Sequence, residues 1–284
     1  MNMIERNPSY ICVEKDIEVS HCKKELSFIN NIPHLHSGYE VYYNISGAKG
    51  FMLNGEFFRC GHRDLIIIPR VQAHKVLVRK NVEYERCIIN FTESVLDLVG
   101  VLCPVQTDLS FITDPTKKDR AVNLTEEQHE EYMALISAYK EAEKDEDGLT
   151  GLSVFVNILS FLQKRFENPK RTVYIDTEEI NYCDRVMQQI ERSFKTASVS
   201  EITDRIFVNG DYANRLFKEE TGLTIKQYLT LRKIAESKKY LYSGKSVKEA
   251  CFLSGFRDYA NFIRTFKKYE GFSPGELDEL AKPM

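Results

Sequence analysis

Three histidines and a glutamate in the N-terminal half of the chain have the residue types and spacing that metal binding needs. They form the pattern His34-x-His36-x3-Glu40, and His74 follows later in the chain. His34, His36 and Glu40 have the same parity, so on an unbroken strand they would face one side of a sheet. Imidazole and carboxylate ligands suit Fe, Mn, Ni, Zn or Cu and leave positions open for a substrate. These four residues are therefore a candidate metal site.

A small organic molecule is an alternative occupant of the same site. Polar side chains that face inward can hydrogen-bond such a ligand, or one another, without any metal. The residues assigned to this ligand site are His34, His36, Glu40, Tyr42 and His74. We expect no cofactor, and keep a divalent metal at the four residues named above as the alternative.

The segment from Ile32 to about Thr92 must position these side chains, and it has the pattern of a β-domain. Asn54-Gly55 between two apolar runs is a strong hairpin signal. Many short β-rich runs at regular spacing predict a sandwich or barrel. The runs are Glu40–Ser46, Phe51–Leu53, Phe57–Arg59, Leu65–Pro69, Lys75–Val78 and Arg86–Phe91.

Two helices are expected between Leu124 and Asn168, joined at Asp145-Glu146-Asp147-Gly148. Thr125 is the expected N-cap of the first helix. The second helix has an apolar stripe that either packs against the barrel or forms a dimer seam, and we favour the seam. The stripe consists of Leu152, Phe155, Val156, Leu159, Leu162 and Phe166.

The last third of the chain contains one helix-turn-helix pattern twice. Arg215 and Gly222 in the first copy recur as Arg264 and Gly271 in the second, each 49 positions later. Between the copies, 224–242 predicts a helix of about 18 residues, roughly 27 Å long. Successive major-groove faces of DNA lie about 34 Å apart, so this helix could hold two recognition helices near adjacent grooves. The expected caps are Ser198 or Ser200, Asn209 and Gly222.

These elements define the predicted domains. Asn168-Pro169-Lys170-Arg171 is the linker candidate, and Asp176-x2-Glu179 after it predicts a helix start. We therefore expect a β-barrel domain at 1–122, a helical hairpin for dimerisation at 123–168, a linker at 169–176 and a DNA-binding domain at 177–284.

Composition supports this division. The 284 residues, 43% of them hydrophobic, can bury two cores. No run approaches the ~18 apolar residues of a membrane span, so we expect a cytoplasmic protein with no membrane partner. From Asp184 onward there are 18 Lys and Arg against 14 Asp and Glu, whereas the rest has 21 against 28. The basic excess thus lies with the duplicated motif, as DNA phosphates require. The seven cysteines contain no CxxC pair and are expected to be reduced thiols.

The chain resembles the AraC/XylS family of bacterial transcription regulators over nearly its whole length. Its N-terminal half is similar to a cupin-like sensor domain, although Pro69-Arg70-Val71 replaces the usual Pro-x-Gly. The resemblance implies an α+β fold: a cupin-like β-barrel with a helical dimerisation segment, then an all-α domain with two helix-turn-helix motifs joined by a linker helix. The C-terminal match runs through Arg215-Leu216-Phe217-Lys218-x2-Thr221-Gly222, Tyr228-Leu229-x2-Arg232, Gly255-Phe256 and Gly271-x2-Pro274.

The resemblance also places the base-reading residues. Arg side chains suit guanine and Asn suits adenine, although the arginines could instead contact phosphates, which carry no sequence information. The implied residues are Asp211, Asn214 and Arg215 in the first copy, and Tyr259, Ala260, Ile263 and Arg264 in the second.

The implied function is that of a sequence-specific, DNA-binding transcription activator controlled by a small-molecule effector in the barrel. Its expected partners are double-stranded promoter DNA, a second copy of the chain and RNA polymerase, and we do not expect an enzyme. One alternative is a metal-dependent cupin enzyme or metal sensor with an attached DNA-binding domain. Another is a DNA-binding protein with an empty barrel.

Overall fold

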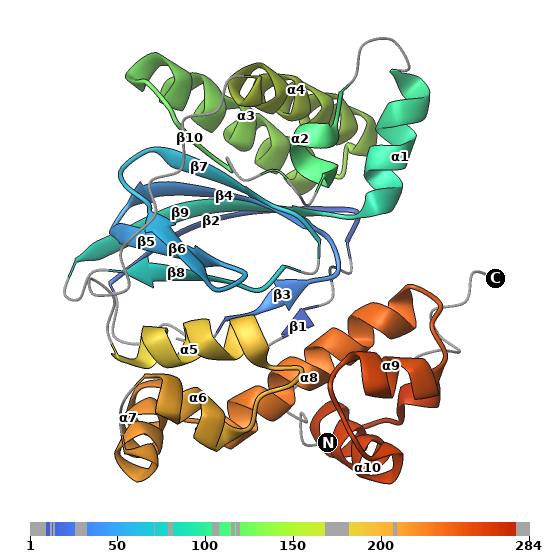
Figure 1. The fold of residues 1–284 in the computed structure, drawn as a ribbon. Coiled ribbons are helices and arrows are strands. Elements are labelled where there is room, and N and C mark those ends of the chain that lie inside the picture. Colours follow the sequence, from blue (N-terminus) through green and yellow to red (C-terminus); the bar gives the residue numbers. More distant parts are fainter. Residues whose placement is uncertain are drawn as a thin grey trace.

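The computed structural model combines an N-terminal β-domain, its covering helices and a C-terminal helical domain (Figure 1), which confirms the α+β class. It describes residues 10–11, 13, 15–25, 33–70, 72–78, 82–103, 108–114, 117, 120–167, 182–206 and 209–276. The strands are β1 (Tyr10–Ile11), β2 (Ile17–Glu25), β3 (Leu35–His36), β4 (Tyr39–Ser46), β5 (Ala48–Leu53), β6 (Glu56–Arg59), β7 (Asp64–Ile68), β8 (His74–Val78), β9 (Glu83–Phe91) and β10 (Ala121–Asn123). The helices are α1 (Glu93–Leu102), α2 (Ser110–Thr113), α3 (Glu126–Lys144), α4 (Gly148–Phe166), α5 (Tyr182–Ser193), α6 (Val199–Arg205), α7 (Gly210–Thr221), α8 (Ile225–Tyr242), α9 (Val247–Leu253) and α10 (Tyr259–Glu270).

The β-domain consists of two antiparallel sheets, with strand orders β10-β7-β4-β9-β2 and β6-β5-β8, and a short parallel pair of β1 and β3. The predicted strands are all present, with ends shifted by a few residues. β2 was not predicted, because Glu18 and Ser20 are exposed whereas Val19 is buried, so this edge strand has little apolar sequence.

Strand β4 shows why the β-domain has two apolar faces. Val41 and Tyr43 belong to a core shared with the covering helices, whereas Tyr42 belongs to the core between the sheets. Side chains on a strand alternate between its two faces, so Glu40 points the same way as Tyr42, into the β-domain.

Helices α3 and α4 form the predicted hairpin and cover the five-stranded sheet. Thr125 caps α3 in a reciprocal capping box with Gln128. The apolar stripe of α4, represented by Phe155 and Leu162, is buried in the core shared with that sheet. Our prediction of a dimer seam on this stripe is wrong, because the β-domain of the same chain already covers it.

The C-terminal domain has two apolar cores, one within α5–α8 and one within α8–α10. Helices α7 and α10 each have 12 residues, and their N-caps, Asn209 and Asp258, lie 49 positions apart. Both helices end at a left-handed glycine, Gly222 or Gly271. The structure therefore confirms the register of the duplication. The linker at 169–176 and the helix start at Asp176-x2-Glu179 lie outside the described residues.

The β-domain contacts α5 of the C-terminal domain directly. Asn54 and Gly55 have φ angles of 50° and 81°, as the predicted two-residue hairpin requires, and a methyl group added to Gly55 would lie 2.9 Å from Glu191 Cβ on α5. Lys75 of β8 donates a hydrogen bond of 2.6 Å to Asp184 of α5, and both side chains are buried. In the described part of the chain, no helix is long and apolar enough to span a bilayer.

Candidate effector site and nucleic-acid interface

The four candidate metal ligands converge at one end of the β-domain. His36 lies on β3, Glu40 on β4 and His74 at the start of β8. His34 joins them through an antiparallel bridge to His74, with backbone N–H···O distances of 3.0 and 2.8 Å. His36 and Glu40 do not lie on one unbroken strand, because the chain bends at Ser37-Gly38 between β3 and β4. Nevertheless, one nitrogen or oxygen from each of the four side chains lies within 4.8 Å of the others.

The cluster is buried and strongly polar. Glu40 Oε2 lies 2.7 Å from His36 Nε2 and 3.5 Å from His74 Nε2. Neither contact has the alignment of a hydrogen bond. Burial alone would raise the pKa of Glu40, but attraction to His36 and His74 outweighs burial and holds this pKa well below its usual range. Glu40 is therefore a carboxylate that can bind a cation.

The orientation of His74 fixes which of its ring nitrogens faces the cluster. Its Nδ1 lies 2.9 Å from the carbonyl oxygen of Gln72. A carbonyl only accepts, so Nδ1 carries the proton of this contact, and Nε2 is the nitrogen that lies next to Glu40. Backbone carbonyls orient metal-binding histidines in the same way.

Tyr42 lies deeper in the β-domain than the other predicted ligand residues. Its hydroxyl is 3.0 Å from that of Tyr84. Burial raises the pKa of Tyr42 well above its usual value, so the phenol stays neutral. The Phe51 ring contacts Tyr42 at 5.2 Å and His74 at 6.0 Å, between ring centres. The Phe51 ring thus lies in contact with both Tyr42 and His74.

Helices α7 and α10 expose most of the predicted base-reading residues. The Arg215 side chain is 63% exposed, and its guanidinium lies 5.3 Å from the centre of the Tyr212 ring. Arg264 occupies the equivalent position on α10 and is exposed. Asp211, Tyr259 and Ala260 are also exposed, whereas Ile263 packs partly against the second apolar core.

Asn214 has a structural contact that sequence reasoning did not identify. Its Oδ1 accepts a hydrogen bond of 3.0 Å from the backbone N–H of Ile225, the first residue of α8. A bidentate contact with adenine needs both ends of the amide. Reading of adenine by Asn214 stays a prediction, and it competes with this bond.

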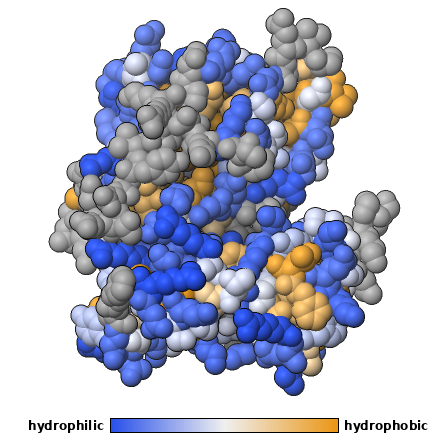
Figure 2. All heavy atoms as spheres, viewed as in Figure 1, coloured by the Kyte–Doolittle hydropathy of each residue, from blue (hydrophilic) through white to orange (hydrophobic). Residues whose placement is uncertain are grey.

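A cleft of about 330 Å³ lies between the two helix-turn-helix units. Three cationic side chains line it: Lys226, Lys233 and Arg257. Hydrophilic side chains cover most of this domain in Figure 2, and the apolar patch on its right lies over α9, where Phe252 and Leu253 are exposed. Cations at such a cleft suit phosphate groups.

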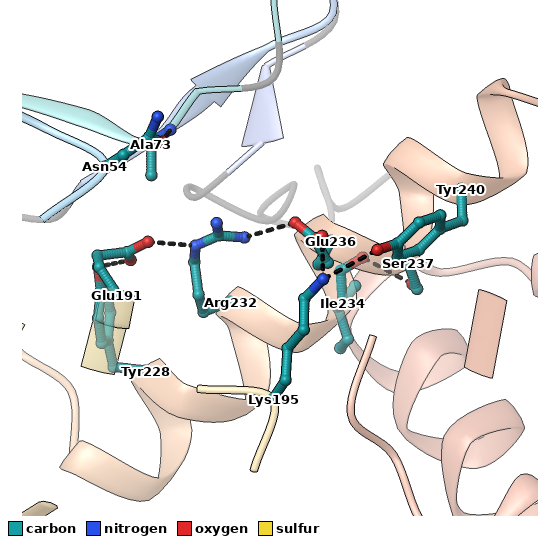
Figure 3. Close-up of polar contacts among 10 residues, drawn as sticks. All are labelled: Asn54, Ala73, Glu191, Lys195, Tyr228, Arg232, Ile234, Glu236, Ser237 and Tyr240. Atoms are coloured by element: carbon teal, nitrogen blue, oxygen red, sulfur yellow. Dashed lines mark hydrogen bonds and ion pairs between the residues drawn. The ribbon is translucent and has the colours of Figure 1, made fainter. Parts of the chain in front are cut away.

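A buried ionic network fixes α5 against α8 (Figure 3). Arg232 Nε donates to Glu191 Oε2 at 2.7 Å, and its Nη1 lies 3.5 Å from Glu236 Oε2. Lys195 Nζ lies 2.8 Å from Glu236 Oε1 and donates to the Tyr240 hydroxyl at 2.9 Å. Nothing in the sequence periodicity pointed to this network or to the pair Lys75–Asp184, because partners so distant in sequence meet only through the fold.

Comparisons with known proteins agree with this architecture. Residues 28–142 match the family model of the AraC-like ligand binding domain, and residues 202–279 match that of a helix-turn-helix domain. The chain thus combines an N-terminal domain of the ligand-binding type with a C-terminal helix-turn-helix domain. The chain belongs to the AraC family of transcription regulators.

Individual relatives are more distant. The chain is 34% identical over 102 residues to the transcriptional regulatory protein HptR of Staphylococcus aureus, covering 36% of this chain and 40% of HptR. It is 27% identical over 143 residues to the uncharacterised regulator YtdP of Bacillus subtilis, covering 49% of this chain and 18% of YtdP. The chain therefore spans less than half the length of these curated relatives. ToxT of Vibrio cholerae with a bound unsaturated fatty acid superposes with a TM-score of 0.37 at 14% identity, over 92% of this chain and 94% of ToxT.

Proposed function

We propose that the chain activates transcription by binding promoter DNA through α7 and α10, under the control of an effector in the β-domain. The observation that carries this proposal is the matched pair of helices: equal length, equivalent caps, and an exposed arginine at the same position of each, Arg215 and Arg264. The two helices read adjacent major-groove segments, and the cationic cleft between the units contacts phosphates.

The effector acts by binding one arrangement of the two domains more tightly than the other. Its site consists of His34, His36, Glu40 and His74, with Tyr42 further inside. Lys75 follows His74 directly and contacts Asp184 of the DNA-binding domain, so a small shift of β8 reaches that domain. Two copies of the chain bind as a homodimer in the cytoplasm and recruit RNA polymerase. The same cluster supports a metal sensor or a metal-dependent enzyme as the second candidate.

Selection from a random library of DNA duplexes with the full chain tests the proposal. We expect a motif of two short boxes separated by about one helical turn, 10 to 10.5 base pairs. The variant Arg215→Ala/Arg264→Ala serves as the matched control and should recover no motif. If the wild type and the double variant both recovered duplexes without an enriched motif, the proposal would be overturned.

A further inference from the structure

The His34, His36, Glu40 and His74 cluster contains several buried polar atoms without aligned hydrogen bonds. They are both ring nitrogens of His36, Nε2 of His74 and Oε2 of Glu40. A buried polar atom without an aligned hydrogen bond is destabilising, and more so when the group is charged. Four such atoms in one cluster indicate that they face a common ligand.

The arrangement of the imidazoles indicates the size and geometry of that ligand. The ring centres lie 4.9 Å apart for His34 and His36, 4.4 Å for His34 and His74, and 4.9 Å for His36 and His74. Around one ion with metal–nitrogen bonds of about 2.1 Å, ring centres are roughly 4.5 Å apart at right angles and roughly 5.2 Å apart at tetrahedral angles. The observed triangle is closest to three ligands on one face of an octahedron.

The environment favours an ion over an organic molecule at this point. Phe51, which is 1% exposed, lies parallel to the His74 ring with the ring centres 6.0 Å apart. The interior beyond it is filled by Tyr42, Phe58, Ile66 and Tyr84. The donor set also suits an ion, because three imidazoles and one carboxylate converge within 4.8 Å of one another.

We propose that His34, His36, Glu40 and His74 bind one divalent first-row transition-metal ion, with coordination positions left open. This proposal rests on the proposed effector role of the β-domain. It identifies the effector as the metal ion itself or as a molecule that binds to this ion. The nitrogen-rich donor set selects Fe²⁺, Co²⁺, Ni²⁺ or Zn²⁺ over Mg²⁺ and Ca²⁺, which prefer oxygen ligands.

Calorimetric titration of the untagged full chain with Ni²⁺ tests the proposal, after dialysis against a chelator and then buffer. The wild type should bind about one Ni²⁺ per chain. His36→Ala and Glu40→Gln should each weaken binding by more than about 100-fold, because removing a ligand costs more than disturbing its supporting hydrogen bonds. A wild type that binds no Ni²⁺, or variants that bind it equally well, would overturn the proposal.

His21→Ala is the matched control. His21 Nε2 also lies 2.7 Å from a carboxylate, that of Glu85, but this pair is on the surface and belongs to no cluster. Its loss should leave Ni²⁺ binding unchanged. A His36→Ala protein that fails to fold is replaced by His74→Gln, and the metal-free melting temperature of each variant reports on its fold.

DNA binding measured on the same samples separates the two proposals. A chain that binds its selected duplex but takes up no Ni²⁺ overturns the metal site alone. A chain that binds Ni²⁺ through these residues but no DNA overturns the proposed function alone. Addition of Ni²⁺ should also raise the melting temperature of the wild type, because a ligand of the folded state stabilises it, and should have no such effect on Glu40→Gln.

Discussion

Lys75 and Asp184 form a buried ion pair that joins the β-domain to the DNA-binding domain. Their atoms Nζ and Oδ1 are 2.6 Å apart, and the two side chains are only 3% and 5% exposed. Lys75 Nζ also lies 3.6 Å from Sδ of Met187, which belongs to the first core of the C-terminal domain. The Lys75–Asp184 pair thus connects β8, which begins at His74, to the core on which α7 packs.

Removal of Lys75 should destabilise the contact between the domains. Lys75→Met takes away the cation that faces Asp184, and breaking a buried pair in this way costs about 3 to 5 kcal/mol. Differential scanning calorimetry should show a lower melting temperature and two separated transitions in place of a coupled one. The double variant Lys75→Met/Asp184→Leu should recover part of the loss.

Arg192→Ala is the matched control for that experiment. Arg192 also crosses the domain boundary, 3.0 Å from Glu56, but the pair is about half exposed. Exposed pairs contribute about 0 to 1 kcal/mol, so this variant should melt close to the wild type. If Lys75→Met and Arg192→Ala lowered the melting temperature equally, burial of the Lys75–Asp184 pair would not be the reason for its contribution.

Gly255 should tolerate no side chain. Its φ is 91°, and a Cβ there would lie 2.4 Å from the backbone oxygen of Lys195. Gly222 has a φ of 75° but no atom within 4 Å of an added Cβ. Gly222→Ala should therefore cost only the left-handed conformation, about 1 to 2 kcal/mol, and Gly255→Ala clearly more. Urea unfolding compares the free energies of unfolding of the two variants. Equal losses would show that the backbone of Gly255 does not pack against Lys195 as described.

Acid should weaken the network around Arg232. Burial raises the pKa of Glu236, but Arg232 and Lys195 outweigh burial, so the folded-state pKa lies below the usual 4.5. A carboxyl with a lowered pKa contributes stability above its unfolded pKa, and this contribution is lost as the pH falls through the folded pKa. The melting temperature should thus fall below about pH 4.5. The Glu236→Gln variant should be less stable at neutral pH, but its melting temperature should fall less on acidification than that of the wild type. If the two melting temperatures fell in parallel, Glu236 would not be a source of the pH dependence.

Sequence and structure agree best where local signals decide the outcome. The caps Ser198, Asn209 and Gly222 and the Asn54-Gly55 turn depend on neighbouring residues, and all were predicted. The stripe on α4 was assigned to the wrong partner, because periodicity gives the apolar face of a helix but not what covers it. The residues of the cluster around Glu40 were predicted, but residue parity could not predict the bend at Ser37-Gly38 or the bridge between His34 and His74 that brings them together.

The contact between Asn214 and Ile225 shows the same limit at the DNA interface. The repeated sequence pattern predicted the position of Asn214 on α7. Its hydrogen bond to the start of α8 depends on how the two helices cross, which the pattern does not give. Asn214→Ala should accordingly lower stability, by about 0.5 to 2 kcal/mol as for other helix-start bonds. Thermal melting in the absence of DNA measures this effect separately from DNA binding. An unchanged melting temperature would show that the bond to Ile225 does not contribute to stability.

Fluorescence anisotropy of full-length variants, on the selected duplex and on a scrambled one, tests most directly whether Arg215 and Arg264 read DNA bases. Arg215→Ala and Arg264→Ala should each cost about 1 to 3 kcal/mol on the selected duplex and little on the scrambled one. Lys226→Ala, in the cationic cleft, is the control and should weaken both equally, as loss of a phosphate contact does. Equal losses on both duplexes for the arginine variants would contradict the account.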